Sequence, residues 1–404
     1  MKTLSQLIEQ YGPPQAVIDH WDKHSKRFAI WGFEDTFSFS AGDTHADPLI
    51  LWQSKLNDWK KETVHPDVSA IGGFAYDLKN YLFPHRKYRP YSGTTPLIWF
   101  GKPARVLEFK LEDEFQPESL NACIKLISDI PSESIYADDL KVIKEHLEFG
   151  NIYQINYTHP KTFEIGNDSF NIYMALRKVS HPPYGLYLNM GSQQILSASP
   201  ERFFCTRSGT ITTHPIKGTR PRSHNPIEDD AMATELYHST KDRAEHLMIV
   251  DLLRNDLGKV CLYGSVKTHN LYKIESFETV HHMVTDISGK LQQNINESDI
   301  IRALFPGGSI TGAPKESAMD VIDEVEDYSR GIYTGALGYI GSDGDMDFNI
   351  AIRTLTVENG KGVYPVGGGI VWDSDPKLEW EEAHYKGRIL DILSQKLTNQ
   401  KTHV

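Results

Sequence analysis

The sequence contains little cysteine and no long apolar run. Its three cysteines, Cys123, Cys205 and Cys261, form an odd set without a C-x-x-C pair. Such a set provides neither a disulfide framework nor a zinc motif, and it is typical of a reducing compartment. No apolar stretch approaches the roughly 20 residues that cross a bilayer, and Glu9 lies where a secretory signal would be apolar. We therefore expect a cytoplasmic protein without a membrane anchor.

Basic residues are also in deficit. The 42 Lys and Arg residues are outnumbered by 54 Asp and Glu residues, which gives a formal net charge of -12. Nucleic acids need a basic face, so we do not expect a nucleic-acid partner. An acidic protein can still bind a small anion, but that site must be built locally from backbone N–H groups, a few Lys or Arg side chains, or a metal ion.

The turn-forming residues divide the chain into helices and hairpins. We predict helices over 138–149 and 227–257, one starting at Pro314, and one opened by Asp375-Pro376. Predicted hairpins join 196–207 to 210–216 and turn at Asp343-Gly344 and at Asn359-Gly360. Successive hairpins with inserted helices indicate an α+β fold, with large antiparallel β-sheets covered by helices.

Acidic residues at helical spacing are the first candidates for chemistry. Asp242 and Glu245 precede an apolar run, and Glu379, Glu382 and Lys386 share one face of the last helix. On spacing alone, a solvated helix face with an i,i+4 ion pair is the favoured interpretation.

Two glycine-rich stretches can expose backbone donors to an anion. The stretch 305–315 leads into a helix but is not a phosphate loop, because Ala313 rather than Lys follows Gly312. Gly367, Gly368 and Gly369 follow a strand, where absent side chains let a ligand touch the backbone. For either stretch alone, a bulge or tight packing is the plainer explanation.

Three single side chains also stand out. Arg353 ends an apolar strand-like run, 348–353, and a buried Arg needs an anionic partner. Lys217 lies between apolar residues and near Arg220 and Arg222, which would lower its pKa and make it nucleophilic, although a surface lysine is favoured without further context. His282 is more typical of a core histidine than of a metal ligand.

Taken together and in order, these segments resemble the chorismate-binding enzymes, which include anthranilate, aminodeoxychorismate, isochorismate and salicylate synthases. The matching segments are 150–156, 199–203, 215–222, 245–256, 306–315, 331–336 and 367–370, with Glu381-Glu382. The resemblance implies the sandwich of antiparallel sheets of that family, with a catalytic core over 131–399. The segment 1–130 matches weakly, mainly at 72–77, and is expected to pack on the core.

The resemblance also implies roles for individual residues. Glu245 and Glu382 match the glutamates that bind Mg²⁺, which would hold a carboxylate of chorismate. Glu201 matches the general acid that protonates the departing C4 hydroxyl, a role that needs a raised pKa. The remaining matches are to substrate-holding or pocket positions: Gln154, His282, Ser309, Gly312, Tyr333, Arg353, Gly367, Gly368, Gly369 and Lys386. Ser309 stands where relatives usually have Thr.

Two positions separate the branches of the family. Isochorismate and salicylate synthases carry a lysine base at the position of Gln154, and Gln cannot activate water, which leaves ammonia as the nucleophile. Anthranilate synthases usually have Ala at the position of Lys217, whereas aminodeoxychorismate synthases have Lys. The resemblance therefore implies amination of chorismate at C4 through Lys217, with anthranilate synthase as the main alternative. Isochorismate synthase and a non-catalytic scaffold are weaker ones.

The same resemblance predicts a partner. We find no glutamine amidotransferase sequence and no catalytic Cys in a nucleophile elbow, so ammonia is expected from a separate amidotransferase subunit or from solution. A Leu-Leu-Glu-Ser-like string of the tryptophan-binding relatives is not evident, and we do not expect feedback inhibition by tryptophan.

Overall fold

A computed structural model describes residues 1–20, 26–43, 47–110, 124–166, 168–277 and 280–401, with side chains described up to residue 395. Cys123 lies outside these ranges. Cys205 and Cys261 are buried free thiols.

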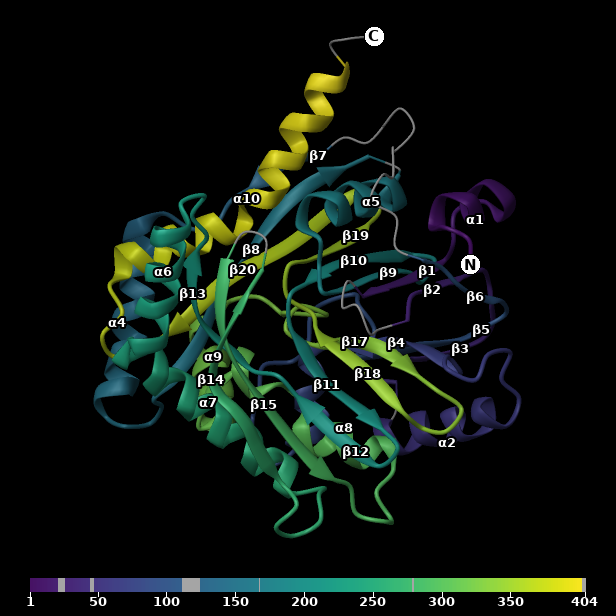
Figure 1. Cartoon of the computed structure of the whole chain (residues 1–404), viewed down its shortest axis with the longest axis horizontal. Coiled ribbons are helices and arrows are strands. Elements are labelled where there is room, and N and C mark those ends of the chain that lie inside the picture. Colours follow the sequence, from purple (N-terminus) through teal and green to yellow (C-terminus); the bar gives the residue numbers. More distant parts are fainter. Residues whose placement is uncertain (21–25, 44–46, 111–123, 167, 278–279, 402–404) are drawn as a thin grey trace.

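The described residues form two 10-stranded sheets in which the paired strands are antiparallel (Figure 1). The first sheet contains, in order, β16 (Gly312–Ala313), β8 (Gln154–Ile165), β20 (Lys361–Ile370), β19 (Thr354–Glu358), β10 (Gln193–Ser199), β9 (Tyr184–Asn189), β1 (Ala16–His20), β2 (Phe28–Ile30) and β6 (Val106–Glu108), with β7 (Ile124–Ser128) beside β8. The second contains β13 (Ile216–Pro221), β15 (Val280–Lys290), β12 (Thr210–Thr213), β11 (Arg202–Arg207), β18 (Met346–Ile350), β17 (Ala336–Ile340), β4 (Ala70–Phe74), β5 (Ile98–Pro103) and β3 (Phe33–Phe39), with β14 (Lys267–Ser276) beside β15. Strands from 1–130 enter both sheets.

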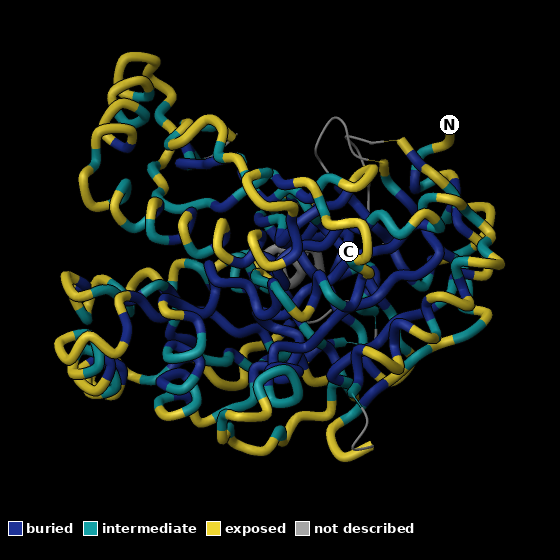
Figure 2. The backbone as a smooth tube through the Cα atoms, turned by 90° about the horizontal axis from the view of Figure 1, so that it is seen from below, coloured by how far each residue is buried: buried dark blue, intermediate teal, exposed yellow. Residues whose placement is uncertain are grey.

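The two sheets pack against each other through a shared apolar cluster. Ile18 on β1 and Leu186 on β9 come from the first sheet, and Ile71 on β4 and Leu337 on β17 come from the second. All four side chains are at most 2% exposed. Figure 2 shows this buried material running through the middle of the molecule. The predicted α+β sandwich of antiparallel sheets is therefore confirmed.

Helices cover the outer faces of the sandwich. Their bounds are α1 (Leu4–Tyr11), α2 (Pro48–Lys61), α3 (Lys79–Leu82), α4 (Glu133–Glu148), α5 (Ser169–Ser180), α6 (Pro226–His238), α7 (Thr240–Gly258), α8 (Glu297–Leu304), α9 (Lys315–Val325) and α10 (Pro376–Lys401), with short 3₁₀ turns η1 (Tyr76–Leu78) and η2 (Gly308–Ile310). Apolar clusters join α5 and α10 to the first sheet and α2, α7 and α8 to the second. No helix in the described part of the chain has both the length and the apolar character needed to cross a bilayer.

Several predicted elements are confirmed and three are corrected. The hairpin turns at 343–344 and 359–360 join β17 to β18 and β19 to β20, and Asp375 caps α10 by accepting the Leu378 N–H. The predicted helix 227–257 is two helices, because Ser239 accepts the Asp242 N–H and starts α7 anew. The predicted strand 196–207 is broken between β10 and β11, where Pro200 lacks a ladder N–H.

The third correction concerns the run 348–353. Strand β18 ends at Ile350, and Arg353 adopts a positive φ of 49° in the link to β19. Because β18 and β19 belong to different sheets, this link is a crossover between the two layers. The break at Pro200-Glu201 is another crossover, since β10 and β11 also belong to different sheets.

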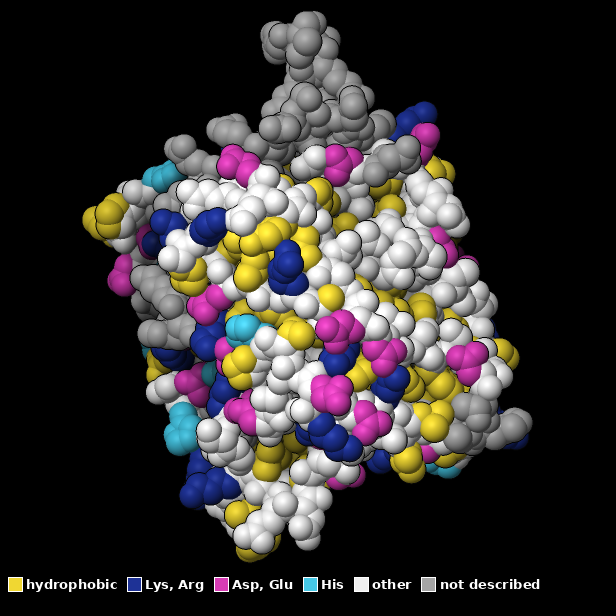
Figure 3. All heavy atoms as spheres, turned by 90° about the vertical axis from the view of Figure 1, so that its right-hand side faces the viewer, with side chains coloured by type: hydrophobic (Ala, Val, Ile, Leu, Met, Phe, Trp, Pro, Cys, Tyr) yellow, Lys and Arg dark blue, Asp and Glu magenta, His cyan; other side chains and the backbone are white. Residues whose placement is uncertain are grey.

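On the face shown in Figure 3, acidic and basic side chains are interspersed and do not separate into patches of one sign. Mixed charge of this kind keeps a surface hydrated.

Candidate active site

A cavity of about 170 Å³ lies at the junction of the two sheets. Eight of the residues predicted from the sequence line it: Glu201, Lys217, Ser309, Tyr333, Arg353, Gly367, Gly369 and Lys386. They come from the two crossovers at Glu201 and Arg353, from β13, from η2, from the segment before β17, from β20 and from α10. The fold thus brings together residues up to 185 positions apart, counting from Glu201 to Lys386.

Glu201 is the buried acid of this cavity. Its side chain is 8% exposed, and Ser309 Oγ donates a hydrogen bond of 2.8 Å to its Oε1. Burial raises the pKa of Glu201 to about 7, against the opposing effects of the Ser309 hydrogen bond and of the positive charge of Lys217. A carboxyl group with this pKa holds a proton near neutral pH, which a general acid requires.

Lys217 faces the same cavity from β13. Its Nζ lies 3.4 Å from the point that a Cβ on Gly369 would occupy. Part of the residue is open to the cavity, but the surrounding protein removes enough water that burial lowers the pKa of the amine, while Glu201 and Glu245 oppose this shift. The plainer interpretation of Lys217 as a surface lysine is therefore wrong.

The expected influence of Arg220 and Arg222 on Lys217 is not what the structure shows. Arg220 pairs with Asp242 at 3.0 Å, and Arg222 pairs with Asp229 at 2.8 Å. Both guanidinium groups are thus neutralised by neighbouring acids, and the positive charge that lowers the pKa of Lys217 comes from Lys386.

The glycines of β20 let the backbone of this strand approach the cavity. Lys386 Nζ donates to the Gly367 carbonyl at 2.9 Å, and a Cβ on Gly369 would come within 2.9 Å of Gln154 Nε2. Gly312 adopts φ 140°, and a Cβ there would lie 2.2 Å from the Gln154 carbonyl. Bulges or tight packing alone do not explain β20, because Gly367 and Gly369 line the cavity.

Gln154 and His282 lie next to the residues that line the cavity. Gln154 is fully buried on β8, and neither polar atom of its side chain has a protein hydrogen-bond partner. His282 on β15 faces Thr219 Oγ1 at 2.9 Å, and burial together with the charge of Arg353 lowers its pKa to about 4. His282 is therefore a neutral side chain beside β13.

Two acids of α10 lie beside Gly368, and one of them, Glu382, is near enough to Glu245 on α7 for the two charges to interact. A Cβ on Gly368 would be 3.5 Å from Glu382 Oε1, from Glu379 Oε2 and from Lys386 Nζ. Burial raises the pKa of Glu245. Burial acts to raise the pKa of Glu382 as well, but Lys386, bonded to it at 2.6 Å, brings that pKa below its ordinary value. Lys386 and Glu382 do form the i,i+4 pair predicted from spacing, but beside the cavity.

Some residues near the cavity were not among the predicted site residues. Asn156 and Tyr364 line it, and Glu379 accepts a 2.6 Å hydrogen bond from Ser374 beside Gly368. Asn156 follows Gln154 by two residues on one strand, so strand alternation would have placed both on the same face. Tyr364 had no such signal, because its position depends on the pairing of β20 with β8.

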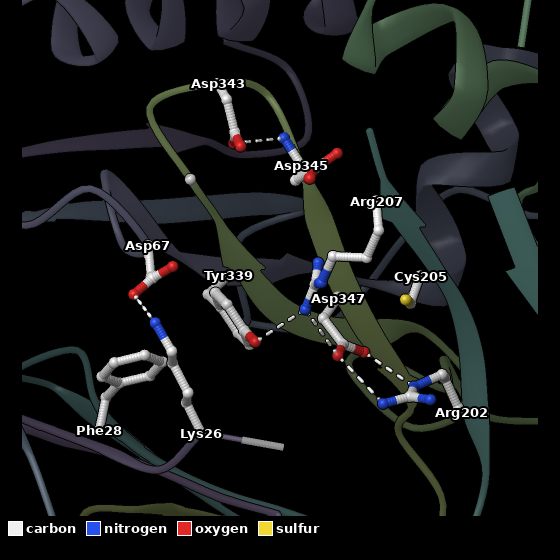
Figure 4. Close-up of a pocket in the computed structure, with 11 residues that line it drawn as sticks. Lys26, Phe28, Asp67, Arg202, Cys205, Arg207, Tyr339, Asp343, Asp345 and Asp347 are labelled. Carbon is white, nitrogen blue, oxygen red and sulfur yellow. Dashed lines mark hydrogen bonds and ion pairs between the residues drawn. The ribbon is translucent and has the colours of Figure 1, made fainter. Parts of the chain in front are cut away.

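A second, larger cavity of about 330 Å³ contains none of the predicted site residues (Figure 4). Of the four aspartates that line it, Asp347 pairs with Arg202 through bonds of 3.0 and 3.1 Å and with Arg207 at 3.3 Å, and Asp67 pairs with Lys26 at 2.6 Å. This cavity is larger than the first cavity, but its Lys and Arg side chains are each paired with an acid. The smaller cavity has the protonated acid and the lysine of lowered pKa, so it is the candidate active site.

The fold and this cavity define an α+β enzyme with a buried acid and a lysine in one site. Residues 14–390 match the model of the chorismate binding enzyme family, and the chain belongs to that family.

Several individual proteins of this family are similar to the chain. Aminodeoxychorismate synthase component 1 of Bacillus subtilis is 41% identical over 382 residues, which cover 84% of this chain and 80% of the relative. The protein of the same name from Escherichia coli is 43% identical over 64% of this chain, and the match spans 58% of that relative. Anthranilate synthases also match. The crystal structure of anthranilate synthase component I from Streptococcus pneumoniae superposes with a TM-score of 0.78 at 24% identity, covering 95% of this chain and 96% of that one.

Proposed function

We propose that this enzyme converts chorismate and ammonia to 4-amino-4-deoxychorismate, the precursor of p-aminobenzoate. The observation that carries the proposal is the presence of Lys217, with a lowered pKa, in the same cavity as Glu201, with a pKa of about 7. One group is an amine suited to nucleophilic attack, and the other is an acid suited to protonating a leaving hydroxyl.

The proposed reaction consists of two allylic displacements. The neutral Lys217 amine forms a bond to C2 of chorismate, both conjugated ring double bonds shift, and the C4–O bond breaks as Glu201 gives its proton to the departing hydroxyl, which leaves as water. Ammonia then forms a bond to C4, both double bonds shift back, and the C2–N bond breaks to return the lysine amine. The proton released by the added nitrogen restores Glu201, so the sum is exchange of water for ammonia.

Arg353 is the proposed anchor for a substrate carboxylate. It lines the cavity, and its positive charge lowers the pKa of neighbouring His282. Chorismate carries two carboxylates, and a guanidinium group can bind one of them through two parallel hydrogen bonds. Tyr333 and the backbone of Gly367 and Gly369 complete the proposed binding surface.

The acids on α7 and α10 suit Mg²⁺. A hard cation takes oxygen ligands and is held by one or two carboxylates, with water and an anionic substrate completing its shell. Within the described residues, no group of three or more His, Cys, Asp or Glu side chains is placed to hold a metal ion. We propose that Glu245 and Glu382 hold the ion. When bound, it supplies positive charge to a substrate carboxylate.

Two side chains of this chain argue against the alternative activities within the family. Anthranilate synthase would add ammonia at C2, where Lys217 would stand in the way of the incoming nucleophile. Isochorismate synthase would need a base at Gln154, and an amide side chain has no basic nitrogen. These two residues support C4 amination over both alternatives.

We also propose a separate glutamine amidotransferase as the source of ammonia. The relatives from Escherichia coli and Bacillus subtilis are both named component 1, which supports a second component for this chain. Purified chain tested alone is expected to use ammonium and not glutamine.

The decisive experiment is identification of the product. The chain is incubated with chorismate, Mg²⁺ and ammonium, and the products are separated by liquid chromatography and identified by mass spectrometry. Aminodeoxychorismate is the expected product. Anthranilate or isochorismate as the main product would overturn the proposal.

A further inference from the structure

A buried ion pair lies behind the cavity. Arg330 Nε donates to Glu326 Oε2 at 2.8 Å, and a second nitrogen of Arg330 donates to Glu326 Oε1 at 2.6 Å. Arg330 is 4% exposed and Glu326 is 3% exposed. A buried ion pair adds little net stability compared with apolar packing, so its value lies in where it directs its other hydrogen bonds.

Arg330 uses those bonds to join three walls of the cavity. It donates to the Ile310 carbonyl at 3.2 Å, to the Asn156 carbonyl at 2.6 Å and to Thr334 Oγ1 at 3.2 Å. Glu326 in turn accepts from the N–H and the hydroxyl of Thr158, at 2.9 and 2.7 Å. The turn η2, the strand β8 and the loop 331–335 therefore share one buried cation.

Each of these walls carries a residue of the proposed site. Ile310 ends η2, where its neighbour Ser309 bonds Glu201. Asn156 lines the cavity. Thr334 follows Tyr333, adopts a positive φ of 58°, and donates its N–H to the Ala351 carbonyl in the link that carries Arg353.

We propose that Arg330 is a positioning residue for chorismate turnover, which holds η2, β8 and the 331–335 loop at the spacing that Glu201, Tyr333 and Arg353 need. Lysine cannot replace it, because the planar guanidinium group offers five N–H donors in a fixed fork. The ammonium group of a lysine is a compact charge with only three N–H donors, so it could bond Glu326 but could not reach the other partners in the same geometry. This inference rests on chorismate use and not on the position of amination.

The test is Arg330→Lys, which keeps the charge beside Glu326 and loses the fork. We expect kcat for chorismate consumption to fall about 10- to 100-fold, since small misplacement of reacting groups costs this much, while KM changes less than about threefold. The alkaline limb of the pH profile should move as well, because η2 carries Ser309, which bonds Glu201. The assay follows the loss of chorismate, whatever product is formed. A product other than aminodeoxychorismate would therefore overturn the proposed function, but the comparison of Arg330→Lys with wild type would still be valid.

Arg177→Lys is the matched control. Arg177 on α5 is a buried arginine ion-paired with Asp19 and belongs to none of the cavity walls. The control is expected to keep kcat within about twofold and an unmoved pH profile. The proposal is overturned if Arg330→Lys is folded with kcat within twofold of wild type, or if both variants lose activity in proportion to their loss of Tm.

Thr334→Val covers the case in which Arg330→Lys does not fold. The substitution is nearly isosteric and removes only the hydroxyl that accepts from Arg330 and donates to the Tyr333 carbonyl. A fall in kcat of about threefold or more at unchanged Tm supports the positioning role, and an unchanged kcat contradicts it.

Discussion

Glu201 and Arg353 stand at two of the points where the chain passes from one sheet to the other, and these two crossovers are hydrogen-bonded to each other. The Ile350 N–H donates to the Glu201 carbonyl at 3.0 Å, and the Ala198 N–H donates to the Arg353 carbonyl at 3.0 Å. These paired bonds fix the spacing between the proposed acid and the proposed carboxylate anchor. Because these site residues lie on crossovers, both sheets hold them in place.

Glu201→Gln is expected to abolish the chemical step while leaving chorismate binding. The amide has nearly the shape of the buried, protonated carboxyl group but cannot give up a proton, and general acid catalysis is worth roughly 10²–10⁴-fold in rate. Steady-state kcat and calorimetric binding of chorismate are the measurements. Glu133→Gln, at an exposed position that starts α4, is the control. A Glu201→Gln enzyme with wild-type kcat would remove Glu201 from the role of acid.

Ser309→Ala should shift the pH dependence. The Ser309 hydrogen bond lowers the pKa of Glu201, so its loss raises that pKa above about 7. Glu201 must be protonated to act, and activity is lost as pH rises through its pKa. The alkaline limb of kcat should therefore move up by about one pH unit. Ser309→Thr keeps the hydroxyl and should leave the limb in place, and equal limbs in all three enzymes would contradict the argument.

The sequence predicted the fold class because turn chemistry is local. Asp343-Gly344 and Asn359-Gly360 specify their hairpins without any distant contact, and Asp375 caps its helix through residues three positions away. The crossovers could not be predicted in this way. The residues around Glu201 and Arg353 look like continuous strands, and only the pairing of each half with a different sheet breaks them.

The candidate site, like the fold, could be predicted from the sequence only in part. Resemblance to a family placed Glu201, Lys217 and Ser309, and the structure brings them to one cavity. The pKa of Lys217 could not be worked out from neighbours in sequence, because Arg220 is neutralised by Asp242, a residue of another element. No sequence pattern indicated a role for Arg330 either, since the carbonyl groups that it bonds are backbone atoms of distant segments.

Removal of the proposed metal ligands is the next prediction. Glu245→Gln and Glu382→Gln should each abolish chorismate turnover and weaken Mg²⁺ binding in calorimetry, because each removes one of two carboxylates offered to a hard cation. EDTA should do the same to wild type, with recovery on added Mg²⁺. Both variants should stay folded, since burial raises the pKa of Glu245 and a neutral side chain is tolerated there. Full turnover in EDTA would disprove the need for the ion.

Lys217→Ala is expected to lose most aminodeoxychorismate formation. The amine must be neutral to attack, and burial lowers its pKa, so more of it is neutral near pH 7 than for an exposed lysine. Wild-type activity should rise as pH increases through the pKa of Lys217 and fall above about pH 7, where Glu201 loses its proton. Lys217→Ala removes the nucleophile that occupies C2, and residual amination by ammonia should therefore move toward C2. Product identity by chromatography and mass spectrometry measures this shift.

A covalent adduct on Lys217 in wild type, trapped during turnover and located by peptide mass spectrometry, would support the two displacements directly. The control is Lys273→Ala, since Lys273 on β14 pairs at the surface with Glu275 at 2.7 Å, and it should change neither rate nor product. Formation of aminodeoxychorismate by Lys217→Ala at the wild-type rate would rule out the covalent route. It would also leave C4 amination without its main support, because Lys217 is the residue on which the distinction from anthranilate synthase depends.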